Sequence, residues 1–315
     1  MYLGGGSATH HDHPDLHAYL GPEGTFAESA LRAVVPEDAR RISKPSITAA
    51  LDAVRYGTVA DATVPWENST AGTVAETIRG LALGEPLIVR REVVLPVELV
   101  LAVPSGTALS DVVKILSHPH ALVQAEPWLA EVSPVASRVL TPSTARAAEA
   151  VARALGAPGG AAVCAEATAG MYGLEVIARP PAGAAPAATR FVVVGKPRPL
   201  APISIAASGG AGERTTMTLL FYFPVSCGPE HVEAALKEAR LSGHRTDRNV
   251  TDLAEGQRCI CVHIRGESSA SVLRRVLAGL RRRGISIRHL GRYPAANPAE
   301  FSGRPQAPIA GTEDS

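Results

Sequence analysis

Hydroxyl, amide and carboxylate side chains stand at the ends of apolar strands in this chain, where they could hold an anionic ligand. The segment VPWENSTAG places Glu67, Asn68 and Ser69 directly after a strand and ahead of a helical stretch. The segment LTPSTARAAEA repeats the arrangement, because Ser143 and Thr144 open a second helix. Side-chain donors and free backbone N–H groups at such a junction suit a carboxylate.

Two further segments add a fixed positive charge and more polar groups. Thr189 and Arg190 stand at the entrance of an apolar strand in PAATRFVVVG, and LSHPHALVQ contributes His118, His120 and Gln124. If all these segments end at one edge of a sheet, their side chains converge. The pattern therefore predicts a site for an anionic small molecule.

Each of these residues also has a purely structural interpretation, and the pattern alone leaves both open. Ser143 and Thr144 could cap a helix, and Asn68 could form an ordinary polar turn. Arg190 could pair with a surface carboxylate for little gain, and His118 could be a core histidine with satisfied hydrogen bonds.

Composition excludes several other classes of protein. Across 315 residues, 46% are apolar and 19% are charged, which is typical of a globular protein. A formal net charge of +1 gives no reason to expect nucleic acid or an acidic membrane as a partner. No apolar run is long enough to span a bilayer. The four cysteines have no disulfide-framework spacing, so we expect a reduced, cytoplasmic protein.

The elements that must position these residues alternate between strand and helix. This alternation predicts an α/β fold with a largely parallel, doubly wound sheet arranged as two lobes. Long β-branched strands near residues 87–103 would carry the chain from one lobe to the other. Ligands in such architectures bind in the cleft at the carboxyl ends of the strands.

Length favours more than one domain, and composition suggests the boundaries. We expect a disordered tail over residues 1–17, a catalytic domain over 18–195 and a Pro-, Gly- and Ser-rich linker over 196–212. Residues 213–293 show a βαββαβ order, which is the pattern of a ferredoxin-like domain. Residues 294–315 are predicted to form a second disordered tail.

Taken together and in this order, the segments YLGPEGTFAESAL, VPWENSTAGTV, SHPHALVQ, STARAA and ATRFVVVG resemble prephenate dehydratase over about residues 18–195. The resemblance implies a two-lobed catalytic domain like a periplasmic binding protein, followed by an ACT regulatory domain. It implies a lyase that converts prephenate to phenylpyruvate, water and CO2 on the route to phenylalanine. Neither a metal nor an organic cofactor is expected.

The same resemblance implies roles for individual residues. Thr189 would donate a hydrogen bond to the leaving hydroxyl group, and Arg190 would hold a carboxylate of the dianionic substrate. Glu67 would help with orientation, and Phe191 would line the ring pocket. The expected substrate-binding set is Arg190, Asn68, Ser69, Glu67, Ser143, Thr144, Phe191 and Gln124.

Some positions depart from the family pattern. Trp66 stands where a smaller aliphatic residue is usual, on the side of the strand predicted to lie opposite Glu67. Ala187 and Ala188 replace residues that are often polar. The C-terminal unit keeps Gly228 but has lost a second ligand-binding motif, so we expect weak or absent feedback inhibition by phenylalanine.

Three alternatives to the dehydratase remain at this stage. They are a non-aromatising prephenate decarboxylase, an arogenate dehydratase of specialised metabolism, and a non-catalytic amino-acid sensor. Exposed sheet edges in the C-terminal unit favour a homodimer or homotetramer.

Overall fold

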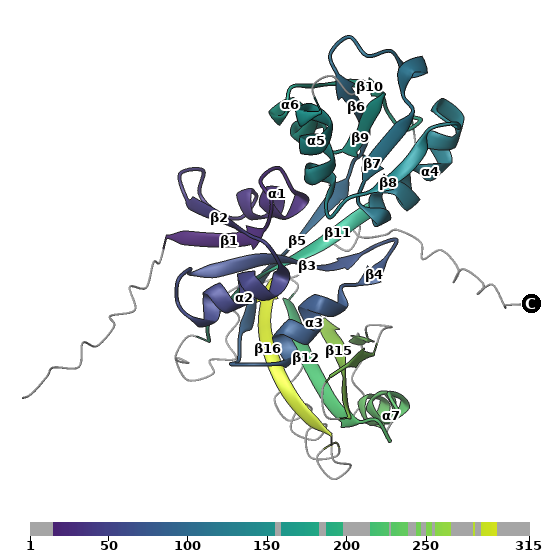
Figure 1. Ribbon diagram of the computed structural model, residues 1–315. Helices are drawn as coiled ribbons and strands as arrows, with labels where there is room; N and C mark the ends of the chain where they lie inside the picture. The colour runs from purple at the N-terminus through teal and green to yellow at the C-terminus, as the bar shows by residue number, and fades with distance from the viewer. Residues whose placement is uncertain are drawn as a thin grey trace, which may run out of the picture.

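The computed structural model contains three β-sheets, two in the N-terminal part of the chain and one in the C-terminal part (Figure 1). The predicted linker and both predicted tails lie almost wholly outside the described part of the chain. The structure describes residues 15–154, 159–182, 187–197, 215–226, 228–238, 244–246, 250–253, 256–265, 280 and 285–294.

The first lobe is built on a sheet with the strand order β2-β1-β3-β11-β5, and a short strand, β4, pairs with β3. Hydroxyl side chains set two of its helix starts: Thr25 caps α1 and Ser46 caps α2. Its elements are β1 (Leu16–Leu20), α1 (Phe26–Arg32), β2 (Arg40–Lys44), α2 (Ile47–Arg55), β3 (Asp61–Asn68), β4 (Gly72–Thr73), α3 (Ala75–Ala82), β5 (Ile88–Val97) and β11 (Ala187–Gly195).

The second lobe is built on a sheet with the strand order β10-β6-β9-β7-β8. Its buried residues are largely alanine, valine and leucine, which fits a chain with only 4% aromatic residues. Its elements are β6 (Val100–Pro104), a 3-10 turn (Leu109–Asp111), β7 (Lys114–Ser117), α4 (Pro119–Val132), β8 (Ser137–Leu140), α5 (Thr144–Arg153), β9 (Gly160–Cys164), α6 (Glu166–Met171) and β10 (Leu174–Ala178).

Both sheets are mixed, so the prediction of a largely parallel sheet was wrong. In the first lobe β1 pairs in parallel with β2 and β3, but β11 runs antiparallel to both β3 and β5. In the second lobe β7 is parallel to β8 and β9, whereas β6 is antiparallel to β9 and β10. Apart from the short β4, the strands that run against the others of their sheet are β11 and β6, by which the chain enters the first and the second lobe.

The chain crosses between the lobes twice, and the predicted crossing near residues 87–103 is confirmed by β5 and β6. The return crossing runs from β10 to β11. The carboxyl ends of β1 and β3 and the start of β11 share one edge of the first sheet. Thr168 of α6, which follows β9, donates a hydrogen bond of 2.6 Å to the Gly24 carbonyl after β1. The strand ends of the two lobes therefore face each other (Figure 1).

The third sheet has the strand order β13-β15-β12-β16, with β14 pairing with β15, and every pairing in it is antiparallel. One face packs against α7, and the predicted second helix of this unit lies outside the described residues apart from Leu280. Its elements are β12 (Thr215–Pro224), α7 (Glu230–Glu238), β13 (His244–Thr246), β14 (Thr251–Asp252), β15 (Gln257–Arg265) and β16 (Ser286–Pro294).

The other face of the third sheet packs on the first lobe. Leu220, Cys259 and Leu290 share a hydrophobic core with Val192 and Val194 of β11. This burial makes the third sheet part of the same core as the first lobe.

Polar groups of the third sheet also cap helix α3. Arg288 donates to the carbonyl of Leu81 at 2.9 Å, and the Tyr222 hydroxyl donates to that of Ala82 at 2.9 Å. The last carbonyls of a helix have no partner within it, so these side chains satisfy groups that would otherwise need water.

Candidate active site

The centre of the candidate site is a hydrogen-bonded pair formed by Asn68 and Thr189. The two residues are direct partners across the antiparallel strands β3 and β11. The Asn68 Nδ2 atom donates to Thr189 Oγ1 at 2.9 Å. Thr189 is buried and Asn68 is half-buried at the edge where the strands meet the second lobe. The structure thus joins two of the residues that the sequence predicted to act together.

The orientation of the Asn68 amide follows from its other contacts. Its Oδ1 atom accepts hydrogen bonds from the backbone N–H groups of Thr70 at 2.9 Å and Ala71 at 3.0 Å. Backbone N–H groups can only donate, so the amide oxygen must face them and the NH2 group must face Thr189. The Thr189 oxygen consequently accepts from Asn68, and its own proton remains to be donated elsewhere.

Ser69 joins the same two strands next to this pair. Its backbone N–H donates to the Ala188 carbonyl at 2.8 Å, and its Oγ atom accepts from the Ala188 N–H at 2.9 Å. These bonds fix the residue that precedes Thr189. The predicted polar turn at Asn68 is therefore present, and it also positions Thr189.

Arg190 and Glu67 lie on the opposite face of the sheet, because successive residues of a strand point to opposite sides. Arg190 Nη2 is 3.2 Å from Glu67 Oε2, and Nη1 is 3.4 Å from Glu92 Oε2 on β5. The side chains of Arg190, Glu67 and Glu92 are 5%, 10% and 2% exposed. The guanidinium is thus neither a surface ion pair nor placed beside Thr189, where a substrate-binding arginine was predicted.

Trp66 lies on the same side of the sheet as Arg190, and the prediction that it points away from Glu67 was wrong. The register of β3 against β11 shifts between Arg190 and Phe191, so that Trp66 is an extra residue in its strand. Such a bulge breaks the alternation of side chains. The Trp66 ring is fully buried, and the Arg190 guanidinium carbon lies 5.6 Å from its centroid.

In the second lobe, Ser143 and Thr144 begin helix α5 after β8. Ser143 Oγ accepts from the Arg146 N–H at 3.0 Å, so the capping interpretation of Ser143 is confirmed. Thr144 is buried at the first position of the helix. Their strand ends at the same sheet edge as β7, whose end carries His118.

His118 is the N-cap residue of α4 and is half-buried. Burial and the neighbouring His120 lower the pKa of His118 from its ordinary value of 6.5. The imidazole is therefore neutral at neutral pH.

Gln124 and Phe191 make contacts within the protein that stabilise β5 and α1. Gln124 Nε2 donates to the carbonyl of Val97, the last residue of β5, at 2.9 Å. The Phe191 ring is buried in a cluster with Tyr19, Ala27 and Leu31, and so packs α1 onto the sheet. Phe191 shares the Thr189 face of β11, but α1 covers it.

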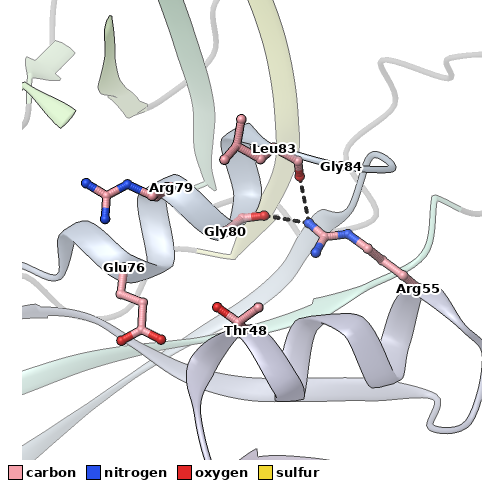
Figure 2. Close-up of a pocket in the computed structure, with 7 residues that line it drawn as sticks. All are labelled: Thr48, Arg55, Glu76, Arg79, Gly80, Leu83 and Gly84. Carbon is pink, nitrogen blue, oxygen red and sulfur yellow. Dashed lines mark hydrogen bonds between the residues drawn. The ribbon is translucent and has the colours of Figure 1, made fainter. Parts of the chain in front are cut away.

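A pocket of about 380 Å³ lies between α2 and α3 (Figure 2). Arg55 reaches across it and donates to the carbonyls of Gly80 and Leu83. None of the predicted site residues lines this pocket. Its lining is Thr48, Arg55, Glu76, Arg79, Gly80, Leu83 and Gly84.

Among the residues that the structure describes, no three histidine, cysteine, aspartate or glutamate side chains are grouped as metal ligands would be. Within the same residues, no helix is long and apolar enough to cross a membrane.

Sequence reasoning did not find Glu92 or His263, which complete the surroundings of Arg190. His263 on β15 places Nε2 3.0 Å from Arg190 Nη2. His263 is a polar residue inside the largely apolar strand segment CICVHIR, and a buried polar residue there needs a partner, which was the available signal. Glu92 stands beside two arginines in VRREVV, so its segment carried no such signal.

Known proteins resemble this chain over most of its length. The family model for prephenate dehydratase matches residues 17–199. A prephenate dehydratase of Mycobacteroides abscessus is 35% identical over 91% of this chain and 92% of that protein. The solved prephenate dehydratase of Arthrobacter aurescens, in complex with L-Phe, has a TM-score of 0.72 and 29% identity, and covers 94% of this chain and 93% of its own. GqqA, described as a novel type of quorum quenching acylase, has a TM-score of 0.72 and 25% identity over 89% of this chain and 98% of its own.

Proposed function

The chain belongs to the prephenate dehydratase family, and we propose that its Thr189 hydroxyl assists the departure of the substrate's hydroxyl group. The enzyme is a carbon–oxygen lyase of aromatic amino acid biosynthesis that converts prephenate to phenylpyruvate. The relatives lend no support to the decarboxylase, the arogenate dehydratase or the sensor.

The chemistry requires one good hydrogen-bond donor at the leaving oxygen. As the ring carboxylate leaves as CO2, the electron pair of its C–C bond moves into the ring, and the C–O bond to the hydroxyl breaks. The ring becomes aromatic, and this supplies the driving force. A threonine hydroxyl is too weak an acid to act as a free proton source, so it acts as a directed donor in a preorganised site.

The observation that carries this proposal is the orientation of Asn68. Because its amide donates to Thr189 Oγ1, the Thr189 proton is free to point toward a bound substrate. The bond also polarises the hydroxyl, which strengthens its donation. Asn68 is thus the residue that sets the direction of the Thr189 hydrogen bond.

The substrate carboxylates are proposed to lie between the facing strand ends of the two lobes. The N-terminus of α5, with Ser143 and Thr144, offers backbone N–H groups and a favourable dipole to an anion. In the turn after β3, Ser69 Oγ accepts from the Ala188 N–H, so its hydroxyl proton is the donor offered from the other side. Arg190 and Glu67 support this edge from behind the sheet, and Gln124 and Phe191 support the crossing strands.

For the C-terminal unit we propose a ferredoxin-like ACT domain. Its order β16-β12-β15-β13, with α7 between β12 and β13, supports a βαββαβ unit. Its departure from the phenylalanine-binding motifs supports weak or absent feedback inhibition.

We also propose a cytoplasmic homodimer or homotetramer. The thiols of Cys164 and Cys259, which form no disulfide, fit a reducing compartment. Among the described strands, β13 is the outermost of the third sheet, and such an edge is a surface on which two copies could join.

Replacement of Thr189 tests the proposed mechanism. Thr189→Val keeps the shape of the side chain and removes the hydroxyl, and should lower kcat by about 10²- to 10³-fold, as loss of one preorganised donor does. Thr189→Ser keeps the hydroxyl and serves as the matched control, with kcat close to wild type. Both are measured by phenylpyruvate absorbance in alkali. A Thr189→Val enzyme with near wild-type kcat would remove Thr189 from the mechanism.

A further inference from the structure

A buried hydrogen-bonded chain leads from the third sheet to the strand pair that carries the candidate site. Tyr293 on β16 and Thr218 on β12 join their hydroxyl groups at 2.6 Å. Thr218 Oγ1 lies 2.9 Å from His263 Nδ1, and His263 Nε2 lies 3.0 Å from Arg190 Nη2. All of these side chains except that of Arg190 come from the C-terminal unit, and all are buried.

The direction of each hydrogen bond follows from what the groups can do. A guanidinium has only donors, so His263 Nε2 must accept from Arg190 and carry no proton. The proton of the neutral ring is then on Nδ1, and it is donated to Thr218 Oγ1. Burial raises the pKa of Tyr293, which therefore stays a neutral phenol at the end of the chain. Arg190 thus sets the tautomer of His263, and Thr218 Oγ1 satisfies the Nδ1 proton of that tautomer.

Arg190 occupies the position next to Thr189, and the pair Arg190–Glu67 directly follows the pair Thr189–Asn68 in the register of β11 and β3. The bulge at Trp66 interrupts regular pairing immediately beyond these positions. The bulged segment is held from behind by the guanidinium, by His263 and by the edge-on contact of the Trp66 and His263 rings, 5.4 Å between centroids. A shift of Arg190 would therefore move both strands at the candidate site.

We propose that His263, a residue of the C-terminal unit, is a positioning residue for the dehydratase reaction. By accepting from Arg190 it sets the place of the guanidinium between Glu67 and Glu92, and so the alignment of Thr189 with Asn68. The proposal rests on the roles proposed above for Thr189 and Asn68. On this proposal the C-terminal unit helps to form the site at all times, whether or not a ligand is bound to that unit.

The first test compares two replacements of His263 in the full-length protein. His263→Leu removes the acceptor, and a small misalignment at the site should lower kcat on the order of 10- to 100-fold while KM changes little. His263→Gln can place its Oε1 atom near the position of Nε2 and accept from Arg190, so it should recover most of the lost kcat. The control is Ile264→Ala on the same strand, which weakens the packing of the other sheet face and leaves the Arg190 contacts intact.

A second pair of variants tests the placement of the His263 ring with a smaller change. Thr218→Val removes the acceptor of the Nδ1 proton at nearly constant volume, so the buried Nδ1–H loses its partner and the ring is no longer held facing Arg190. Thr218→Ser keeps the acceptor. We expect Thr218→Val to lower kcat and Thr218→Ser to leave it near wild type, even if His263→Leu does not fold.

The outcomes separate this proposal from a purely structural role and from the assignment of Thr189. Midpoints of urea unfolding are measured for every variant. The proposal is overturned if Ile264→Ala, at equal loss of stability, lowers kcat as much as His263→Leu, or if the glutamine and serine variants recover nothing. Activity retained in Thr189→Val would exclude Thr189 from the mechanism. A loss of kcat in His263→Leu that His263→Gln recovers would still show that His263 positions the site.

Discussion

The direction of the hydrogen bond between Asn68 and Thr189 can be reversed by a change of one atom, from the Asn68 amide nitrogen to a carboxylate oxygen. In Asn68→Asp, Oδ1 still accepts from the N–H groups of Thr70 and Ala71, and these bonds become charge-assisted. The second carboxylate oxygen replaces Nδ2 at 2.9 Å from Thr189 Oγ1. A carboxylate can only accept, so Thr189 must donate its proton to Asp and no longer to the substrate.

The expected effect is large on the reaction and small on the fold. Losing one preorganised donor costs about 2.7–4 kcal/mol of transition-state stabilisation, or about 10²- to 10³-fold in kcat. The added negative charge should also raise KM for a dianionic substrate. The free energy of unfolding should change by less than about 1 kcal/mol, because every backbone donor of the turn keeps its partner.

A double-mutant cycle shows whether the two residues act as one. Phenylpyruvate formation is measured for Asn68→Asp, Thr189→Val and the double variant, with urea unfolding of each as a check on folding. If Asp acts by capturing the Thr189 proton, the double variant has about the same kcat as either single variant. A kcat for Asn68→Asp within about threefold of wild type, or losses that multiply in the double variant, would refute the reasoning.

Three further predictions concern the rest of the molecule. Gly291→Ala should lower the free energy of unfolding by about 2 kcal/mol or more, because Gly291 has a φ of +132° and an added Cβ would meet the Val89 carbonyl oxygen at 2.3 Å. Gly106→Ala is the control for backbone strain alone, because Gly106 has a φ of +81° and an added Cβ would meet nothing within 4 Å. If urea unfolding shows the same loss of stability for both variants, the close approach of β16 to β5 is contradicted. Burial raises the pKa of Cys164 and of Cys259 to about 12, so neither thiol should react with a thiolate-selective reagent at pH 8 until the protein unfolds, and mass-spectrometric labelling of either in the folded protein would disprove this. Calorimetry of the full-length protein should show no micromolar binding of phenylalanine, and a micromolar Kd would show that the divergent C-terminal unit still holds this ligand.

Local features of the structure could be predicted well from the sequence. Serine and threonine residues ahead of apolar helices cap them, as Thr25 and Ser143 do. Alternating strand and helix segments produced the two lobes, and the β-branched stretch near residues 87–103 crosses between them. These features depend on hydrogen bonds and side-chain periodicity within a few residues, so the sequence carries them directly.

The prediction of largely parallel sheets was wrong because the direction of a strand depends on where the chain re-enters the sheet. That point is decided by contacts between residues far apart in the sequence. β11 enters the first sheet between β3 and β5, more than one hundred residues after β3. Its neighbours are therefore set by packing of the whole lobe.

The sequence by itself determined the residue types at the strand ends, including Asn68 and Thr189, but the pairing of these two residues came from the packing of β11 against β3. Only the tertiary structure decided what surrounds Arg190. One extra residue at Trp66 shifts the register, and a buried guanidinium needs partners that distant strands supply, Glu92 from β5 and His263 from β15. A one-residue shift reverses the faces of a strand, and desolvation makes an unpaired charge costly. For that reason the surroundings of Arg190 became visible only when the three sheets were packed together.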